Sequence, residues 1–242
     1  MKKFLICLVV IAVVATIGLL SVQGYAGTSG WKWPRWRLYD NFDSGVIDPN
    51  RWIVMGHPDV ADISIEDGRA KFVHKEDKAG QSSFLTFKMD PYKLSKIKGV
   101  RATVTVEDCT SVPAPGVNDV RGRIGGYVGK LGNEDVFDQL AVQGGLDRIF
   151  GGLSASSDLI NYYDLFWAHF EEPLDIIGNT FTITMIFSNS CVTYQATGLG
   201  TITFSLPRRM SPMHIYHMGI GTRSTNGFGS CTVYFDDVYV LY

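Results

Sequence analysis

Two groups of carboxylates are the first candidates for chemistry in this chain of 242 residues. Retaining hydrolysis of a glycosidic bond needs two carboxyl groups about 5 to 5.5 Å apart. Glu134 and Asp138 are four residues apart, which on an extended strand corresponds to about 13 Å. The pair Glu171-Glu172 has no third acidic residue beside it. We therefore expect residues 134–138 to be a solvated loop entering a strand, Glu171-Glu172 to be a solvated strand end, and neither segment to be catalytic.

Aromatic residues give a better indication of ligand binding. On an expected strand at residues 162–170, Tyr163, Trp167 and His169 share one face, and Phe166 and Phe170 share the other. Sugar rings stack on exposed aromatic faces, as other amphipathic ligands do. One face of such a strand has to be core. The segment is therefore either a ligand platform built on Tyr163, Trp167 and His169 or a strand whose aromatic residues serve packing alone.

Other patterns that indicate chemistry are weak or missing from the sequence. Of five histidines, only His214 and His217 are close, and three residues apart on a strand they would lie on opposite faces. The sequence has no Gly-x-Ser-x-Gly elbow, no phosphate loop and no Cys-x-x-Cys. We therefore expect no transition-metal site, acyl transfer, nucleotide binding or thiol redox chemistry.

The first 26 residues have the layout of a secretory signal. Lys2 and Lys3 precede an uncharged apolar stretch at residues 4–20, and the segment ends in small residues up to Ala26. We predict cleavage after Ala26 and a secreted, periplasmic or cell-envelope protein. The alternative is an uncleaved membrane anchor, because the apolar stretch is nearly long enough to span a bilayer.

The net charge argues against nucleic acid and anionic lipid as partners. Removing residues 1–26 lowers the 22 basic residues to 20, against 24 acidic ones. This balance gives no electrostatic attraction to nucleic acid or anionic lipid.

The dominant hydrophobic period is two, which is the period of a half-buried strand. Apolar and polar residues alternate at residues 100–107, 181–185 and 202–206, and Asp67-Gly68 is typical of a tight hairpin turn. We expect further strands at residues 122–130, 138–143, 162–170, 192–197, 215–221 and 232–241. There is no linker, no repeat and no convincing helix, and the chain contains 26 glycines. Residues 27–242 are therefore predicted to form one all-β domain, a two-sheet antiparallel β-sandwich of the jelly-roll type.

The two ends of the chain resemble one protein superfamily. The opening segment at residues 39–52, with Asp40-Asn41-Phe42-Asp43 before Trp52, is similar to the start of concanavalin A-like lectin/glucanase domains. The closing segment at residues 233–240 is similar to their end. The first and last strands of this fold lie in one sheet, so the resemblance implies a jelly roll like those of laminin G-like domains and carbohydrate-binding modules.

The resemblance does not extend to the acid motif of the enzymes in this superfamily. Glycosidases of the laminarinase type carry Glu-x-Asp-x-x-Glu or Glu-x-Asp-x-Glu on one strand. At residues 134–138 of this chain Val136 occupies the middle same-face position, and the second glutamate is missing. The resemblance therefore implies the fold without the catalytic residues, and this fold hosts enzymes, lectins and structural modules alike.

Three cysteines follow the signal segment, namely Cys109, Cys191 and Cys231. An exported protein with three cysteines is most simply explained by one disulfide and one free thiol. Cys109 ends one expected strand and Cys231 begins another that could run antiparallel beside it, so we predict a Cys109–Cys231 disulfide. The alternative is that all three stay reduced as small buried residues.

Jelly-roll domains resembling this one often hold calcium where the first and last strands meet. Asp236 and Asp237 are adjacent on the closing strand, so one carboxylate is expected to point inwards, where an unpaired charge is costly. The resemblance implies Asp236 as a ligand of a structural calcium ion, with Asp43 or a nearby carbonyl as its partner. The alternative is a buried aspartate that accepts backbone hydrogen bonds from the opening turn.

These observations favour an exported, non-catalytic β-sandwich module that binds a glycan or a cell-surface polysaccharide, or that serves in adhesion. One alternative is a glycoside hydrolase whose acids lie at other positions, and another is a structural cell-envelope protein with no small ligand. An exposed aromatic cleft without a close acid pair favours the first function, and a close pair in the cleft favours the hydrolase. A binding face filled by the protein's own loops favours the structural role.

Overall fold

The computed structural model describes residues 35–56, 59–75, 80–109, 119–171, 174–211, 217–224 and 229–242. These residues belong to one compact unit, Pro34–Tyr242. The predicted signal segment, residues 1–26, and His214 lie outside the described residues. Among the described residues, no helix is both long and apolar enough to cross a membrane.

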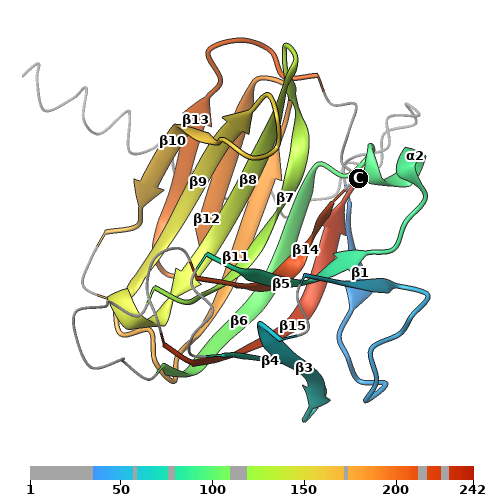
Figure 1. Ribbon diagram of the computed structural model, residues 1–242, viewed down its shortest axis with the longest axis vertical. Helices are drawn as coiled ribbons and strands as arrows, with labels where there is room; N and C mark the ends of the chain where they lie inside the picture. Colours follow the sequence, from blue (N-terminus) through green and yellow to red (C-terminus); the bar gives the residue numbers. More distant parts are fainter. Residues whose placement is uncertain are drawn as a thin grey trace, which may run out of the picture. The chain divides into compact units, whose positions relative to one another are not determined.

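Two antiparallel sheets form a β-sandwich, which confirms the predicted fold class (Figure 1). In the first sheet the strand order is β13-β12-β11-β6-β15-β4-β3, and β1 also pairs with β15. The first described strand and the last therefore lie side by side, as the resemblance implied. The strands of this sheet are β1 (Trp36–Asp40), β3 (Ala61–Glu66), β4 (Arg69–His74), β6 (Gly99–Cys109), β11 (Thr180–Phe187), β12 (Cys191–Ala196), β13 (Gly200–Ser205) and β15 (Cys231–Leu241).

The second sheet has the order β10-β9-β8-β7-β14-β5-β2. Figure 1 shows β10, β9, β8 and β7 next to one another in this sheet. Two short helical turns, α2 (Pro91–Leu94) and η1 (Gly144–Leu146), connect strands. The strands are β2 (Trp52–Gly56), β5 (Ser82–Phe87), β7 (Arg121–Leu131), β8 (Glu134–Gln143), β9 (Arg148–Ser156), β10 (Tyr163–His169) and β14 (Met218–Arg223).

The core lies between the two sheets, and alternation along each strand decides which side chains enter it. On β6 the even-numbered residues Val100, Ala102, Val104 and Val106 are fully buried, as their spacing predicts. On β7 a Cβ atom at Gly122 would overlap the side chain of Val233 in the opposite sheet. The even-numbered positions at this end of β7 therefore face the core, and its odd-numbered positions face outwards.

A two-residue turn joins β3 to β4, as Asp67-Gly68 predicts. Glu66 pairs with Arg69, so only Asp67 and Gly68 lie between the strands. Both have positive φ, 51° for Asp67 and 69° for Gly68. This is the backbone conformation that closes a tight hairpin without splaying its strands.

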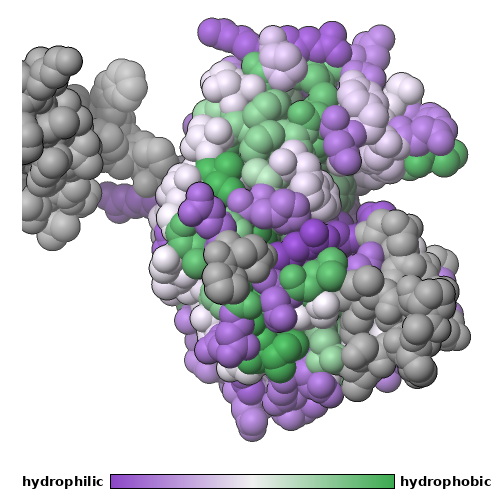
Figure 2. Space-filling view, turned by 90° about the vertical axis from the view of Figure 1, so that its left-hand side faces the viewer, coloured by the Kyte–Doolittle hydropathy of each residue, from purple (hydrophilic) through white to green (hydrophobic). Residues whose placement is uncertain are grey.

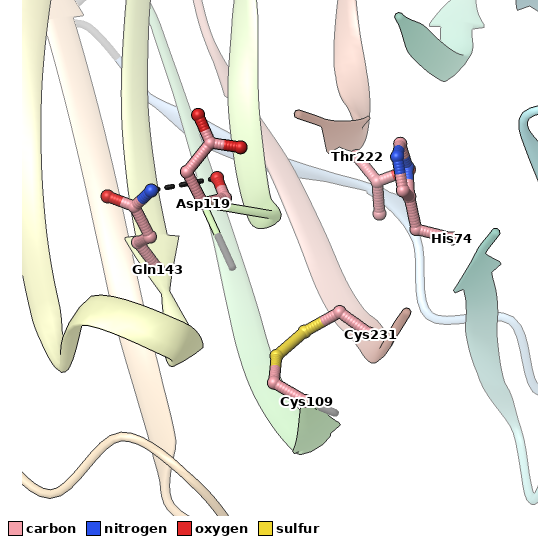
Figure 3. Close-up of a disulfide and its surroundings, with 6 residues drawn as sticks. All are labelled: His74, Cys109, Asp119, Gln143, Thr222 and Cys231. Carbon is pink, nitrogen blue, oxygen red and sulfur yellow. Dashed lines mark hydrogen bonds between the residues drawn. A yellow bond between two sulfur atoms is a disulfide. The ribbon is translucent and has the colours of Figure 1, made fainter. Parts of the chain in front are cut away.

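Cys109 and Cys231 lie opposite each other where β6 and β15 pair, and the structure joins them in a disulfide (Figure 3). The bond links residues 122 positions apart in the chain. Close by, Gln143 Nε2 donates a hydrogen bond to the carbonyl oxygen of Asp119 at 2.7 Å. Cys191 is a partly buried free thiol. The bond therefore fixes the same end of two neighbouring strands of the first sheet.

Candidate functional site

A cleft of about 270 Å³ lies on the outer face of the second sheet, the face turned away from the core. Residues of β7, β8, β9, β10 and β14 line it, together with Tyr162, which directly precedes β10. Its aromatic lining residues are Tyr127, Phe137, Tyr162 and Trp167, and its polar ones are Arg121, Gln139, Ser154, Asp164 and Arg223. The cleft thus combines aromatic side chains with two arginines and one carboxylate.

Trp167 provides a flat aromatic surface because its neighbour on β9 is a glycine. Trp167 pairs with Gly152, and a Cβ atom at Gly152 would overlap the indole ring. The indole also stacks on the fully buried Phe150, with ring centroids 4.4 Å apart and planes inclined by 26°. Trp167 keeps 38% of its surface exposed. An aromatic face held rigidly from below and open above is suited to stacking against a sugar ring.

The three residues predicted to form a ligand platform do not share one face of β10. The pairing of β10 with β9 shifts by one residue between Asp164 and Phe166, so that Leu165 forms a bulge. Trp167 and Asp164 line the cleft, whereas Tyr163 pairs with the core-facing Ala155 on the other side of the sheet. The prediction of a common face is therefore wrong for Tyr163.

Tyr163 and His169 have other neighbours than the cleft. The hydroxyl group of Tyr163 donates a hydrogen bond to Glu134 Oε2 at 2.8 Å, and Glu134 also contacts Arg208 at 3.3 Å. The ring of His169 lies 6.0 Å from that of Phe150 and 6.4 Å from that of Trp167. His169 thus lies on the same face as Trp167 but beyond the lining of the cleft.

Glu134 and Asp138 lie on the same face of β8, and this face is turned away from the cleft. Residues 134–138 form strand from the first residue, so the expected loop is wrong. Asp138 is fully buried on the core side, where Tyr194 donates a hydrogen bond to its Oδ1 atom at 2.5 Å. Burial raises the pKa of Asp138 to about 7. The residues of β8 that line the cleft are Phe137 and Gln139, and neither is a carboxylate.

Asp164 is the one carboxylate among the described lining residues of the cleft. Its Oδ1 atom accepts a hydrogen bond from Ser154 at 2.9 Å, and its side chain is exposed. A retaining or an inverting glycosidase uses two carboxyl groups on opposite sides of the scissile bond. The described lining offers a ligand aromatic stacking and charged hydrogen bonds, and it does not contain such a pair.

Arg123 is a buried cation that contacts two lining residues of the cleft, Phe137 and Gln139, and that sequence analysis did not single out. It is 1% exposed, and it donates hydrogen bonds to Gln139 Oε1 at 2.8 Å and to Ser82 Oγ at 3.1 Å. Its guanidinium lies over the rings of Phe84 and Phe137, 4.5 and 5.2 Å from their centroids. Burial, and then the positive charges of neighbouring arginines, lowers the pKa of Arg123. Cation–π contacts and neutral acceptors thus hold this charge in place of a carboxylate.

His217 illustrates the positive electrostatic environment near Arg123. Its ring packs edge-on against Phe84 and lies 6.2 Å from the ring of Tyr127. Burial, and then the charge of Arg123, lowers its pKa to about 4.

Within the part of the chain that the structure describes, no cluster of three or more His, Cys, Asp or Glu side chains is arranged to hold a metal ion.

Asp43 and Asp236, the residues predicted to bind calcium, lie near each other, but the carboxylate of Asp236 is not buried as expected. Asp236 is partly exposed and Asp237 is exposed with φ 47°, because the pairing of β15 with β6 shifts between Asp236 and Tyr239. The expectation that one of these carboxylates points inwards is therefore wrong. Burial, and then the charges of Asp237 and Asp43, raises the pKa of Asp236. A cation bound between two neighbouring carboxylates would neutralise their mutual repulsion. A calcium ion between Asp43 and Asp236 stays a prediction.

The buried carboxylate of the opening turn is Asp40. It accepts hydrogen bonds from the backbone N–H of Phe42 at 3.0 Å and from Trp52 Nε1 at 2.7 Å. Arg51 lies 3.5 Å from the same carboxylate. Asp40 is 4% exposed, and these contacts satisfy its charge within the protein. The structural role foreseen for a buried aspartate thus belongs to the first strand and not to the last.

No family model and no curated protein sequence matches the chain. Solved structures that share its fold include an endo-1,3-beta-glucanase (laminarinase) catalytic domain from Thermotoga petrophila, at 13% identity and a TM-score of 0.60, covering 87% of this chain and 99% of that one. The kappa-carrageenase from Pseudoalteromonas carrageenovora has 11% identity and a TM-score of 0.54, covering 91% and 100%. A glycoside hydrolase family 16 endo-glucanase from Bacteroides ovatus has 9% identity and a TM-score of 0.55, covering 84% and 98%.

At such low identity these likenesses show the fold alone. The surface itself is of mixed character. Figure 2, which shows the side of the molecule that faces left in Figure 1, has hydrophobic patches separated by hydrophilic residues.

Proposed function

We propose that the protein is an exported glycan-binding module that holds a polysaccharide in the cleft of the second sheet without hydrolysing it. The observation that carries this proposal is the aromatic cleft with a single described carboxylate. Trp167, held between Gly152 and Phe150, supplies the stacking surface, and Arg121, Gln139 and Asp164 supply polar groups around it. The fold shared with glycan-active enzymes is consistent with a carbohydrate ligand.

A glycoside hydrolase is the second candidate. The family 16 endo-glucanase and the laminarinase with the same fold favour it. In this chain Asp164 is the carboxylate in the described lining of the cleft, and Glu134, which contacts Tyr163 and Arg208, lies on the other face of the sheet, so a second acid would have to come from outside the described lining. Release of reducing ends from a polysaccharide, abolished by Asp164→Asn, would establish this candidate in place of the first.

A glycan array scored for both binding and hydrolysis tests the proposal. We expect binding without product release, and a loss of about tenfold or more in affinity for Trp167→Ala, since stacking on one aromatic ring typically contributes about 1 to 3 kcal/mol. Tyr163→Ala is the matched control, because this aromatic side chain lies on the same strand but on the other face. Equal losses for Trp167→Ala and Tyr163→Ala, or no glycan binding at all, would contradict the proposed cleft.

A further inference from the structure

We propose that the glycan is anionic, and that its carboxylate or sulfate group binds between Arg121 and Arg223 at the edge of the cleft. This inference rests on the proposed function, and it names the class of ligand for the same cleft. Both arginines line the cleft. A guanidinium offers a planar pair of donors that matches a carboxylate or a sulfate oxygen pair.

The strand register brings the two arginines together. Arg121 on β7 and Arg223 on β14 are direct partners in the antiparallel ladder. The Cβ atoms of such partners are about 4.5 to 5.5 Å apart, and like charges at this position repel each other. The same row continues through Gln143 on β8 to Arg148 on β9, whose Nε atom donates to Gln143 Oε1 at 2.6 Å. Three guanidinium groups therefore occupy one row across four strands.

No described carboxylate pairs with either arginine. Among the described residues, neither Arg121 nor Arg223 forms a hydrogen bond or an ion pair through its guanidinium, and the buried Nε atom of Arg121 has no partner. Asp119 attracts both arginines through its charge, but its Oδ1 atom accepts a hydrogen bond from Ser224 at 2.7 Å. Donors that lack an acceptor at the edge of a cleft fit an anionic group supplied by the ligand.

Burial makes these unused donors costly to the free protein. Arg121 is 4% exposed, and burial, followed by the charge of Arg223, lowers its pKa to about 10. Arg123 lies two residues further along β7 and adds a buried positive charge that interacts with both arginines. An anion bound here would gain charge-assisted hydrogen bonds and would also relieve the repulsion between the arginines. A neutral sugar hydroxyl can accept a hydrogen bond from either arginine, but it carries no charge that would relieve their repulsion.

The aromatic lining favours a charged sugar over a bare inorganic anion. Trp167, Tyr162 and Tyr127 line the same cleft as the two arginines. A sugar unit with a carboxylate or a sulfate group can stack on the indole while its charge reaches the arginine row. Free sulfate or phosphate would use the arginines only, and its binding would not depend on Trp167.

Paired polysaccharides that differ only in charge test the inference. The probes are κ-carrageenan with its desulfated form, and alginate with its carboxyl-reduced form, measured by calorimetry or affinity electrophoresis. We expect at least one anionic member to bind more tightly than its neutral partner, and the pair that responds identifies sulfate or carboxylate as the recognised group. Arg121→Gln and Arg223→Gln should each weaken that binding about tenfold or more. They should weaken binding to the neutral partner by a clearly smaller factor, and an equal loss with both partners would contradict the inference.

Arg37→Gln on β1 is the matched control, because this exposed arginine belongs to the other sheet. We expect it to change affinity by less than about twofold. Thermal unfolding of each variant verifies that it is folded. Equal binding of charged and neutral partners, or an equal effect of Arg37→Gln, would overturn the inference while the glycan-binding function stands. Failure of every polysaccharide to bind would refute the proposed function itself.

Discussion

The free energy of unfolding of the wild-type protein should contain a contribution from Asp138 that falls as the pH rises from about 4 to about 7. Replacing Asp138 with asparagine should abolish this contribution. Asp138 has no exposed surface, and its Oδ2 atom has no hydrogen-bond partner among the described residues. Burial raises its pKa from 3.8 to about 7, and the hydrogen bonds from Tyr194 and from the backbone of Gln139 offset only part of this effect. The folded protein therefore favours the protonated carboxyl group.

The sign and the size follow from this pKa. Between pH 3.8 and about 7, the folded state binds more protons at Asp138 than the unfolded state does, so the free energy of unfolding falls as the pH rises. The stabilising contribution is fully present below about pH 4 and is lost above about pH 7. A shift of about three pKa units corresponds to at most roughly 4 kcal/mol.

Urea unfolding of the wild type and of Asp138→Asn at several pH values between about 4 and 8 measures this contribution. We expect the difference in unfolding free energy between the two proteins to change by about 2 to 4 kcal/mol over this range, in favour of the variant at high pH. His217 titrates in both proteins, and because its pKa is lowered its own contribution rises with pH and cancels in the difference. A difference that is independent of pH would refute the reasoning.

Tyr194→Phe is an independent control on the same carboxyl group. It removes the hydrogen bond that holds the pKa of Asp138 down, so the pH range over which stability falls should move to higher pH. An unchanged range would mean that Tyr194 does not interact with Asp138 in solution.

Two further predictions concern covalent and metal links. Peptide mapping without reduction should recover a peptide in which Cys109 is linked to Cys231, and it should recover Cys191 as a free thiol. Reduction of the disulfide should lower the free energy of unfolding by about 2 to 4 kcal/mol. A peptide linking Cys191 to Cys109 or to Cys231 would contradict the pairing. Excess calcium should raise the melting temperature several degrees above that in excess chelator, and Asp236→Ala should abolish the difference. Identical melting curves in calcium and chelator, for a sample shown to be metal-free, would leave Asp43 and Asp236 without a bound ion.

The fold was predictable wherever one face of a strand is buried and the other is wet. The alternation on β6 and the Asp67-Gly68 turn are local signals, and the structure has both at the expected positions. Strand β9 was not predicted, because its sequence does not alternate. Ile149 faces the core and Phe150 faces outwards, yet both are fully buried, since Trp167 covers Phe150. A strand buried on both faces has no period of two to detect.

Two of the errors, those at Tyr163 and Asp236, have the same kind of physical cause, which is an irregularity in the strand pairing. Counting by twos assumes that no residue is inserted into the ladder. The bulge at Leu165 turns Tyr163 away from Trp167, and the register shift after Asp236 removes the expected inward carboxylate. Neither irregularity has a glycine to mark it in the sequence. The part of the platform after the bulge, Trp167 and His169, kept its common face.

The arginine row could not be predicted, because it depends on topology. Along the chain, Arg121-Gly122-Arg123-Ile124 has the pattern of an ordinary strand with a wet face. Only the pairing of β7 with β14, which are far apart in sequence, places Arg223 opposite Arg121. The net charge of −2 describes the attraction of the whole chain at long range, whereas a bound group responds to the charges that surround it. A chain with an acidic balance can therefore carry a cationic cleft, and the balance that argued against nucleic acid and anionic lipid does not argue against an anionic glycan bound at this one position.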